Sequence, residues 1–251
     1  WPYGRKPEYD NIASFVSSGM RAIKDVGCKA ETMIHLDNGG NNGAAAGLVS
    51  DVYQFEQISL TRYGHLTVLG QASQLVVPNG SVLVGDATKP NMRVEGTINY
   101  TSIDPLLING VNLVVAGEIL GVSDINIGET MAAGLTLNAR TWAHNLNNQY
   151  YFNDIRVAGN GLLYLVGYDN GDTNWTNDYG VTLSLTNLNV DSGGLVSAEA
   201  TGYGWTRGPG NRNLQMHQGA AHGGYGANSG VAPYGDPYEP WMLGSSAGNA
   251  D

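Results

Sequence analysis

The chain has 251 residues, of which 42% are hydrophobic and 14% are charged, so it can form a folded core and is not expected to be disordered. The 36 glycines are about twice ordinary usage, and the lysine, arginine and glutamate that long helices favour are scarce. A net charge of −10 without a basic cluster argues against nucleic acid as a partner, and no apolar run is long enough for membrane insertion. The composition predicts a β-rich protein with many turns.

Residues 1–43 differ in pattern from the rest of the chain. Apolar residues recur at helical spacing over residues 11–26, with Asp10 suited to cap the start of a helix and Gly27 suited to end it. The segment ETMIHLD, residues 31–37, then predicts a short buried strand. We therefore expect a helix–strand segment that acts as a cap or a docking element for the remainder.

Beyond this segment the apolar residues alternate, and a template of two short strands around a glycine recurs. The closest copies occupy residues 58–68, 155–165 and 188–198, and looser copies centre on Gly80 and Gly117. In each copy both strands present alternate apolar residues to one side, and the glycine permits a tight corner between them. The template predicts pairs of short strands at these positions.

Units of this kind cannot bury their apolar faces alone, so they must stack on one another. Stacking predicts a parallel β-solenoid over residues 44–251. A β-sandwich remains the alternative, because the segments PNGS, INGV and DNGD contain the Asn-Gly pairs that favour hairpins.

The glycine-rich region at residues 202–251 is expected to be a long ordered loop region packed on the solenoid. A catalytic interpretation makes His222 and Glu239 an acid/base pair. A structural interpretation, which we favour, makes both residues hydrogen-bonding anchors of the loop. The aromatic and apolar side chains expected at an interface are Phe15, Tyr238, Trp241 and Met242.

The chain also contains features typical of extracellular and carbohydrate-binding proteins. N-glycosylation sequons begin at Asn79, Asn99 and Asn174. Trp175 and Trp205 are candidate glycan contacts, and Arg207 and Arg212 beside Trp205 could also stack on sugar rings. Together with the low charge, these features favour an extracellular or cell-surface glycoprotein.

No motif in the sequence predicts a metal, a cofactor or a nucleophile. The five histidines lack metal-ligand spacing, and the DNGDTN segment lacks the spacing and the terminal glutamate of an EF-hand loop. There is no Gly-x-Ser-x-Gly motif and no phosphate-binding loop with a lysine. We therefore assign no catalytic, cofactor-binding or metal-binding residue.

The segment WPYGRKPEYDNIASFVSSGMRAIKDVGCKAETMIHLDNGGNN resembles an internal piece of the arabinogalactan endo-1,4-β-galactanases, a glycoside hydrolase family with a TIM-barrel fold. The resemblance implies that Trp1, Pro2 and Gly4 match a segment that follows the acid/base glutamate, and that His35 lies on the next barrel strand. It therefore also implies that the acid/base glutamate would precede Trp1.

Retaining hydrolysis needs a second carboxylate about 5 Å from the first, supplied by a later barrel strand. Glu8 and Glu31 are the glutamates within the resembling segment, and both are expected on the surface. The alternation of strands and helices that a (β/α)8 barrel requires does not continue beyond it. We therefore expect that this segment is not a glycosidase.

The C-terminal region, from LNVDSGGLVSA to GSSAGN, resembles a glycine-rich module of large extracellular surface proteins that fold as right-handed parallel β-helices. The motifs that carry the resemblance lie at residues 193–194, 202–203, 208–210, 222–226, 234–240 and 243–245. The implied fold class is all-β, a right-handed parallel β-helix with the N-terminal helix–strand segment as its cap.

Three functions are compatible with these features. A structural protein of the cell exterior comes first: a self-assembling subunit of a fibre, sheath or appendage whose partners are copies of itself, because open strand edges invite head-to-tail pairing. A glycan-binding adhesin module comes second, and a polysaccharide-active glycoside hydrolase related to galactanases comes third. The last two would have carbohydrate as the partner.

Overall fold

A computed structural model of the chain defines its fold. The residues that it describes are 33–36, 52–54, 58–60, 65–68, 73–77, 83–85, 87, 90–139, 149–168, 171–172, 174–175, 178, 180–199, 201–203, 207–210, 233–235, 238 and 243–245. Within these ranges, no helix is long and apolar enough to cross a membrane.

The secondary-structure elements of the described residues are short strands. Their bounds are Met33–Leu36 (β1), Val52–Gln54 (β2), Ile58–Ser59 (β3), His65–Val68 (β4), Gln74–Val77 (β5), Leu83–Val84 (β6), Asn91–Val94 (β7), Thr97–Tyr100 (β8), Leu106–Asn109 (β9), Asn112–Val115 (β10), Glu118–Leu120 (β11), Asp124–Ile127 (β12), Ala133–Asn138 (β13), Gln149–Tyr151 (β14), Asp154–Val157 (β15), Gly161–Val166 (β16), Thr182–Ser184 (β17), Asn187–Val190 (β18) and Leu195–Ser197 (β19).

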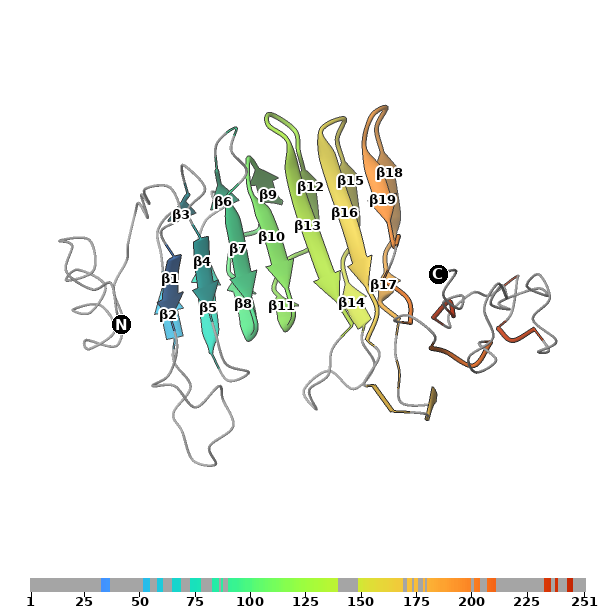
Figure 1. Cartoon of the computed structure of the whole chain (residues 1–251). Helices are drawn as coiled ribbons and strands as arrows, with labels where there is room; N and C mark the ends of the chain where they lie inside the picture. The colour runs from blue at the N-terminus through green and yellow to red at the C-terminus, as the bar shows by residue number, and fades with distance from the viewer. Residues whose placement is uncertain are drawn as a thin grey trace. The chain divides into compact units, whose positions relative to one another are not determined.

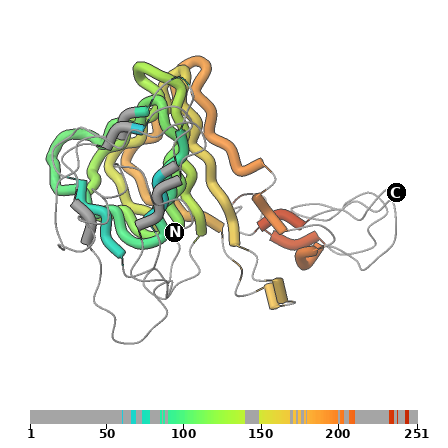
Figure 2. Tube along the Cα trace, turned by 60° about the vertical axis from the view of Figure 1, so that its left-hand side comes forward, coloured from blue at the N-terminus to red at the C-terminus, as the bar shows by residue number. Residues whose placement is uncertain are grey.

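Strands that are three places apart in the chain lie side by side, as in the parallel pairs β4–β7, β5–β8 and β12–β15 (Figure 1). The seven-stranded sheet has the order β1-β4-β7-β10-β13-β16-β19. The six-stranded sheet has the order β18-β15-β12-β9-β6-β3, the four-stranded sheet β11-β8-β5-β2, and β14 pairs with β17. Figure 2 shows successive passes of the chain following one another along the stack of strands.

The core consists of apolar side chains that face inward from alternate positions of each strand. On the seven-stranded sheet, Met92 lies in register with Leu66 on one side and Leu113 on the other, and all three are at most 1% exposed. On the six-stranded sheet, Ile125 lies between Leu106 and Ile155, all fully buried. The period-two pattern in the sequence is therefore the pattern of core and surface in the fold.

The corner between β10 and β11 shows why glycine recurs in the template. The amide of Glu118 donates to the carbonyl oxygen of Gly96, which lies in the corner between β7 and β8, at 3.0 Å. A Cβ atom on Gly117 would lie 1.8 Å from that same oxygen. Only a residue without a side chain allows the two corners to approach so closely.

Burial is lost at β18, which is the edge strand of the six-stranded sheet. Leu188 and Val190 are in register with the fully buried Ile155 and Val157, yet they are 44% and 46% exposed. The sequence pattern of β18 is that of a core strand, and its exposure follows from its position at the edge of the sheet.

The chain separates into two compact units. The first consists of Trp1–Thr136, Tyr151–Leu163 and Leu185–Leu195, and the second of Leu137–Tyr150, Tyr164–Ser184 and Val196–Asp251. Most of the parallel strands belong to the first unit, whereas the described residues of the glycine-rich region belong to the second.

Hydrogen bonds connect the described parts of the glycine-rich region in the second unit. The hydroxyl of Ser245 donates to the hydroxyl of Tyr234 at 2.8 Å and accepts from the amide of Gly210 at 2.9 Å. The Tyr234 hydroxyl in turn donates to the carbonyl oxygen of Leu243 at 2.5 Å. Burial raises the pKa of Tyr234, and the hydrogen bond from Ser245 acts in the opposite direction. Three sequence motifs of this region are thus joined in one network.

The structure confirms the strand pairs that the template predicts and corrects the predicted fold class. Strands β3 and β4, β15 and β16, and β18 and β19 lie where the three closest copies predict them. The chain is, however, not a single β-helix with a helix–strand cap: its parallel strands form several separate sheets, and β1 is a strand of the seven-stranded sheet. The helix expected over residues 11–26 lies outside the described residues.

Candidate carbohydrate-contact site

Arg207 holds the turn that precedes Trp175 in the second unit. Its guanidinium donates to the carbonyl oxygen of Gly171 at 2.8 Å and to that of Asp172 at 2.7 Å. The same guanidinium lies over the Trp175 ring, with its central carbon 5.8 Å from the ring centroid. One arginine thus fixes both the backbone of the turn and one contact of the aromatic side chain.

Tyr203, which lies near Arg207 in the sequence, also contacts Trp175. The Trp175 and Tyr203 rings meet edge to face, with centroids 5.2 Å apart and an interplanar angle of 77°. Tyr203 is only 6% exposed, and its amide donates to the carbonyl oxygen of Gly244 at 3.0 Å. Trp175 itself is half-buried, and Tyr203 and Arg207 support its ring.

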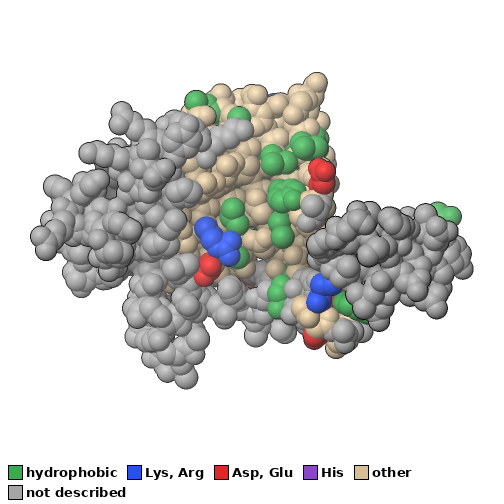
Figure 3. All heavy atoms as spheres, in the orientation of Figure 1, with side chains coloured by type: hydrophobic (Ala, Val, Ile, Leu, Met, Phe, Trp, Pro, Cys, Tyr) green, Lys and Arg blue, Asp and Glu red, His purple; other side chains and the backbone are tan. Residues whose placement is uncertain are grey.

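An aromatic ring beside an arginine suits the recognition of sugars. The apolar ring face packs on the C–H groups of a sugar, and guanidinium N–H groups donate to hydroxyl oxygens. The described part of the surface in Figure 3 carries few charged side chains, and its hydrophobic side chains stand in separate patches.

Other residues predicted from the sequence are only partly brought into this arrangement. Trp175 is part of it, but Trp205, Arg212, Phe15, Trp241 and Met242 lie outside the described residues, as do His222 and Glu239. Tyr238 is described and is 92% exposed. Sequence reasoning placed Arg207 beside Trp205 and missed both its contact with Trp175 and the role of Tyr203. No local pattern signals these contacts, because the partners lie far apart in the chain.

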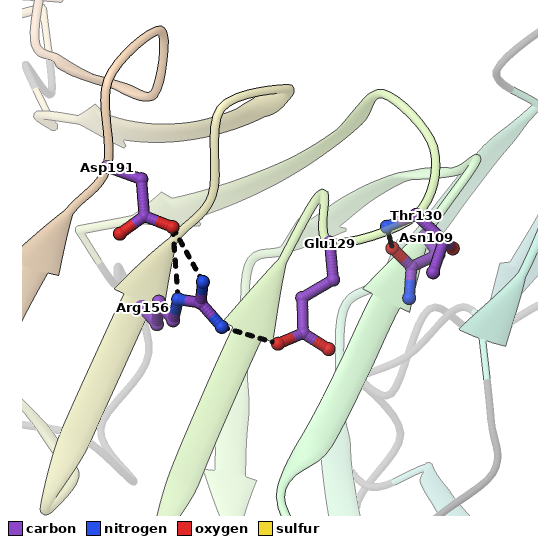
Figure 4. Close-up of polar contacts among 5 residues, drawn as sticks. All are labelled: Asn109, Glu129, Thr130, Arg156 and Asp191. Atoms are coloured by element: carbon purple, nitrogen blue, oxygen red, sulfur yellow. Dashed lines mark hydrogen bonds and ion pairs between the residues drawn. The ribbon is translucent and has the colours of Figure 1, made fainter.

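The first unit contains a separate cluster of charged side chains, drawn in Figure 4. Arg156, on β15, donates to Asp191 at 2.8 and 3.1 Å and to Glu129 at 2.9 Å. The hydrogen bond and the charge of Asp191 are the main reasons that the pKa of Arg156 is raised. Asp191 follows β18 and Glu129 follows β12, so one guanidinium ties together the corners of three neighbouring strands. An arginine remains protonated at any ordinary pH, which suits a structural clamp rather than proton transfer.

A second contact in Figure 4 joins two corners of the same sheet: the amide of Thr130 donates to the side-chain oxygen of Asn109 at 2.9 Å. Asn109 is buried, so this hydrogen bond also satisfies a polar group in the interior.

In the described ranges of the chain, no group of three His, Cys, Asp or Glu side chains is placed to hold a metal ion.

Comparisons with known proteins match the N-terminal part of the chain. Residues 1–67 match the model of glycosyl hydrolase family 53. Two curated proteins, each named "Probable arabinogalactan endo-beta-1,4-galactanase A", from Aspergillus flavus and Aspergillus oryzae, are each 46% identical over 41 residues. That segment is 16% of this chain and 12% of each relative. No solved structure matches the chain.

These matches confirm the N-terminal resemblance to galactanases and correct two other predictions. The family is a glycoside hydrolase family, which the resemblance associates with a parallel α/β barrel, so the prediction of a single right-handed β-helix for the chain is wrong. The expectation of a structural protein that assembles into filaments is also corrected, because the matched family is a glycoside hydrolase family and the matched proteins are named as galactanases. The comparisons do not support the resemblance of the C-terminal region to surface-protein modules.

Proposed function

We propose that this protein is polysaccharide-active, a glycoside hydrolase related to family 53 with galactan as its substrate class, which replaces the expectation from the sequence that its N-terminal segment is not a glycosidase. The observation that carries the proposal is the match of residues 1–67 to that family. The relatives from two Aspergillus species, which are named as galactanases, support the choice of galactan. A polymer of this kind is met outside the cell, so we also propose an extracellular location.

A second candidate is a glycan-binding module that does not cleave its ligand. The observation that favours it is the half-buried Trp175, fixed by Arg207 and Tyr203 in the second unit. A rigid aromatic ring loses little conformational entropy on binding, so it can contribute to affinity without any catalytic group nearby.

One experiment separates the two candidates. The purified chain is incubated with β-1,4-galactan and with arabinogalactan, and new reducing ends and retention in a galactan-containing native gel are both measured. Xylan and cellulose serve as control polymers, and heat-denatured protein as the control for contamination. Release of reducing ends from galactan alone supports the hydrolase, whereas retention without release supports the binding module. If the protein shows neither release of reducing ends nor retention in the gel, both candidate functions are contradicted.

Substitution of Trp175 tests the contribution of the candidate site to galactan binding. We expect Trp175→Ala to weaken retention on galactan about 2- to 13-fold, because an aromatic contact contributes about 0.5–1.5 kcal/mol beyond area burial. Titration of the polymer in affinity electrophoresis measures the change. Tyr151→Ala is the matched control, since Tyr151 is also aromatic and is 63% exposed but lies in the first unit. Equal affinity of the Trp175 variant and the unaltered protein would exclude Trp175 from the binding site.

A further inference from the structure

The turn that contains Trp175 also contains an N-glycosylation sequon, Asn174-Trp175-Thr176. Asn174 is exposed, and its backbone amide donates to the side-chain oxygen of Asp172 at 2.6 Å. The Arg207 hydrogen bonds to Gly171 and Asp172 fix the turn on the preceding side. The acceptor asparagine thus lies at the surface, next to backbone that hydrogen bonds from Arg207 hold in place, where an attached sugar chain can extend into solvent.

The sequon at Asn99 has a different environment. Asn99 lies in β8 and is half-buried. Its neighbours in register are Val76 on β5 and Leu120 on β11, one on each side. Adjacent strands are about 4.8 Å apart, so a sugar attached to Asn99 would leave the sheet between two flanking apolar side chains. The sequon at Asn79 lies outside the described residues.

We propose that Asn174 is N-glycosylated, and that it is occupied in preference to Asn99. In the reaction, the side-chain nitrogen of Asn174 forms a bond to C1 of an oligosaccharide carried on a lipid diphosphate. The bond between C1 and the diphosphate oxygen breaks, the lipid diphosphate leaves with the electron pair, and the amide nitrogen loses one proton. The inference goes beyond the proposed function and requires only that the chain is exported through a glycosylating compartment.

The test is translation of the chain, fused to a cleavable secretion leader, with and without microsomes, followed by electrophoresis before and after removal of N-glycans by endoglycosidase H. The variants are Asn174→Gln, Thr176→Ala, Thr176→Ser and Asn99→Gln. We expect Asn174→Gln and Thr176→Ala each to lose one glycan-dependent band shift, and Thr176→Ser to retain it. Asn99→Gln is expected to match the unaltered chain.

Thr176→Ser keeps a sequon at the same position, so it is the control for a band shift that is lost only because a substituted chain folds poorly. Treatment with peptide-N-glycosidase followed by mass spectrometry then identifies the modified residue, because the enzyme converts a glycosylated asparagine to aspartate. An unaltered band pattern for Asn174→Gln, or conversion at Asn99 with none at residue 174, would overturn the inference. The readout is independent of galactan cleavage, so the failure of this proposal and of the proposed function can be told apart.

Discussion

Replacing Gly117 with alanine is expected to lower the free energy of unfolding of the first unit by at least about 3 kcal/mol, at the upper end of the cost of overpacking. The new Cβ would lie 1.8 Å from the carbonyl oxygen of Gly96 and 2.4 Å from that of Glu95. Both atoms belong to the backbone of a neighbouring corner, which cannot rotate away as a flexible side chain could. Relief of the clash requires the two corners to separate, which stretches the hydrogen bond between Glu118 and Gly96.

Urea unfolding followed by far-ultraviolet circular dichroism measures this change, and Gly134→Ala is the matched control. Gly134 is also buried, but a Cβ atom there would have one close neighbour, the side-chain oxygen of Asn112 at 3.0 Å. The next nearest atoms would lie 3.9 Å away. Alanine within a strand also loses less conformational entropy than glycine on folding. We expect the control to lie within about 1 kcal/mol of the unaltered chain. Similar midpoints for the two variants would show that the corners are not packed as described.

Leu135→Ala is expected to cost about 2–5 kcal/mol of stability, the range for removing a buried leucine side chain. Leu135 lies in β13, the strand between β10 and β16 in the seven-stranded sheet, and is fully buried. Truncation leaves a cavity in a core that has sheet neighbours on both sides, so the surrounding side chains can fill it only in part.

Thr136→Ala provides the comparison for this substitution, because Thr136 is the next residue of β13 and is half-buried on the opposite face. Because side chains alternate along a strand, we expect Thr136→Ala to change the free energy of unfolding by no more than about 0.5 kcal/mol. Thermal unfolding of both proteins measures the difference. A larger loss for Thr136→Ala than for Leu135→Ala would mean that the core lies on the other face of the sheet.

Much of the strand content could be predicted from the sequence because its signal is local. In the segment of residues 155–165, apolar residues alternate on both sides of Gly161, and β15 and β16 lie there in the structure. The distribution of these strands among separate sheets could not be predicted in the same way. Alternation determines which side chains face inward, but it does not determine which strands become neighbours.

The candidate site shows the same limit. Trp175 could be identified because tryptophan is rare and this one lies within a sequon. Its contacts with Tyr203 and Arg207 depend on how distant segments of the second unit pack, and neither segment carries a periodic signal. The clamp formed by Arg156, Glu129 and Asp191 was missed for this reason too, since its three members come from separate strand corners.

The pairing of strands three places apart bears on how a gene of this kind can change its length. In the described sheets, a strand such as β12 hydrogen-bonds to β9 on one side and to β15 on the other. Duplication or deletion of β4–β6, which contribute one strand to each of the three larger sheets, would therefore leave the strands on either side with neighbours of the same sheet. Evolution can lengthen or shorten such a stack in whole steps, while the loops between strands diverge independently.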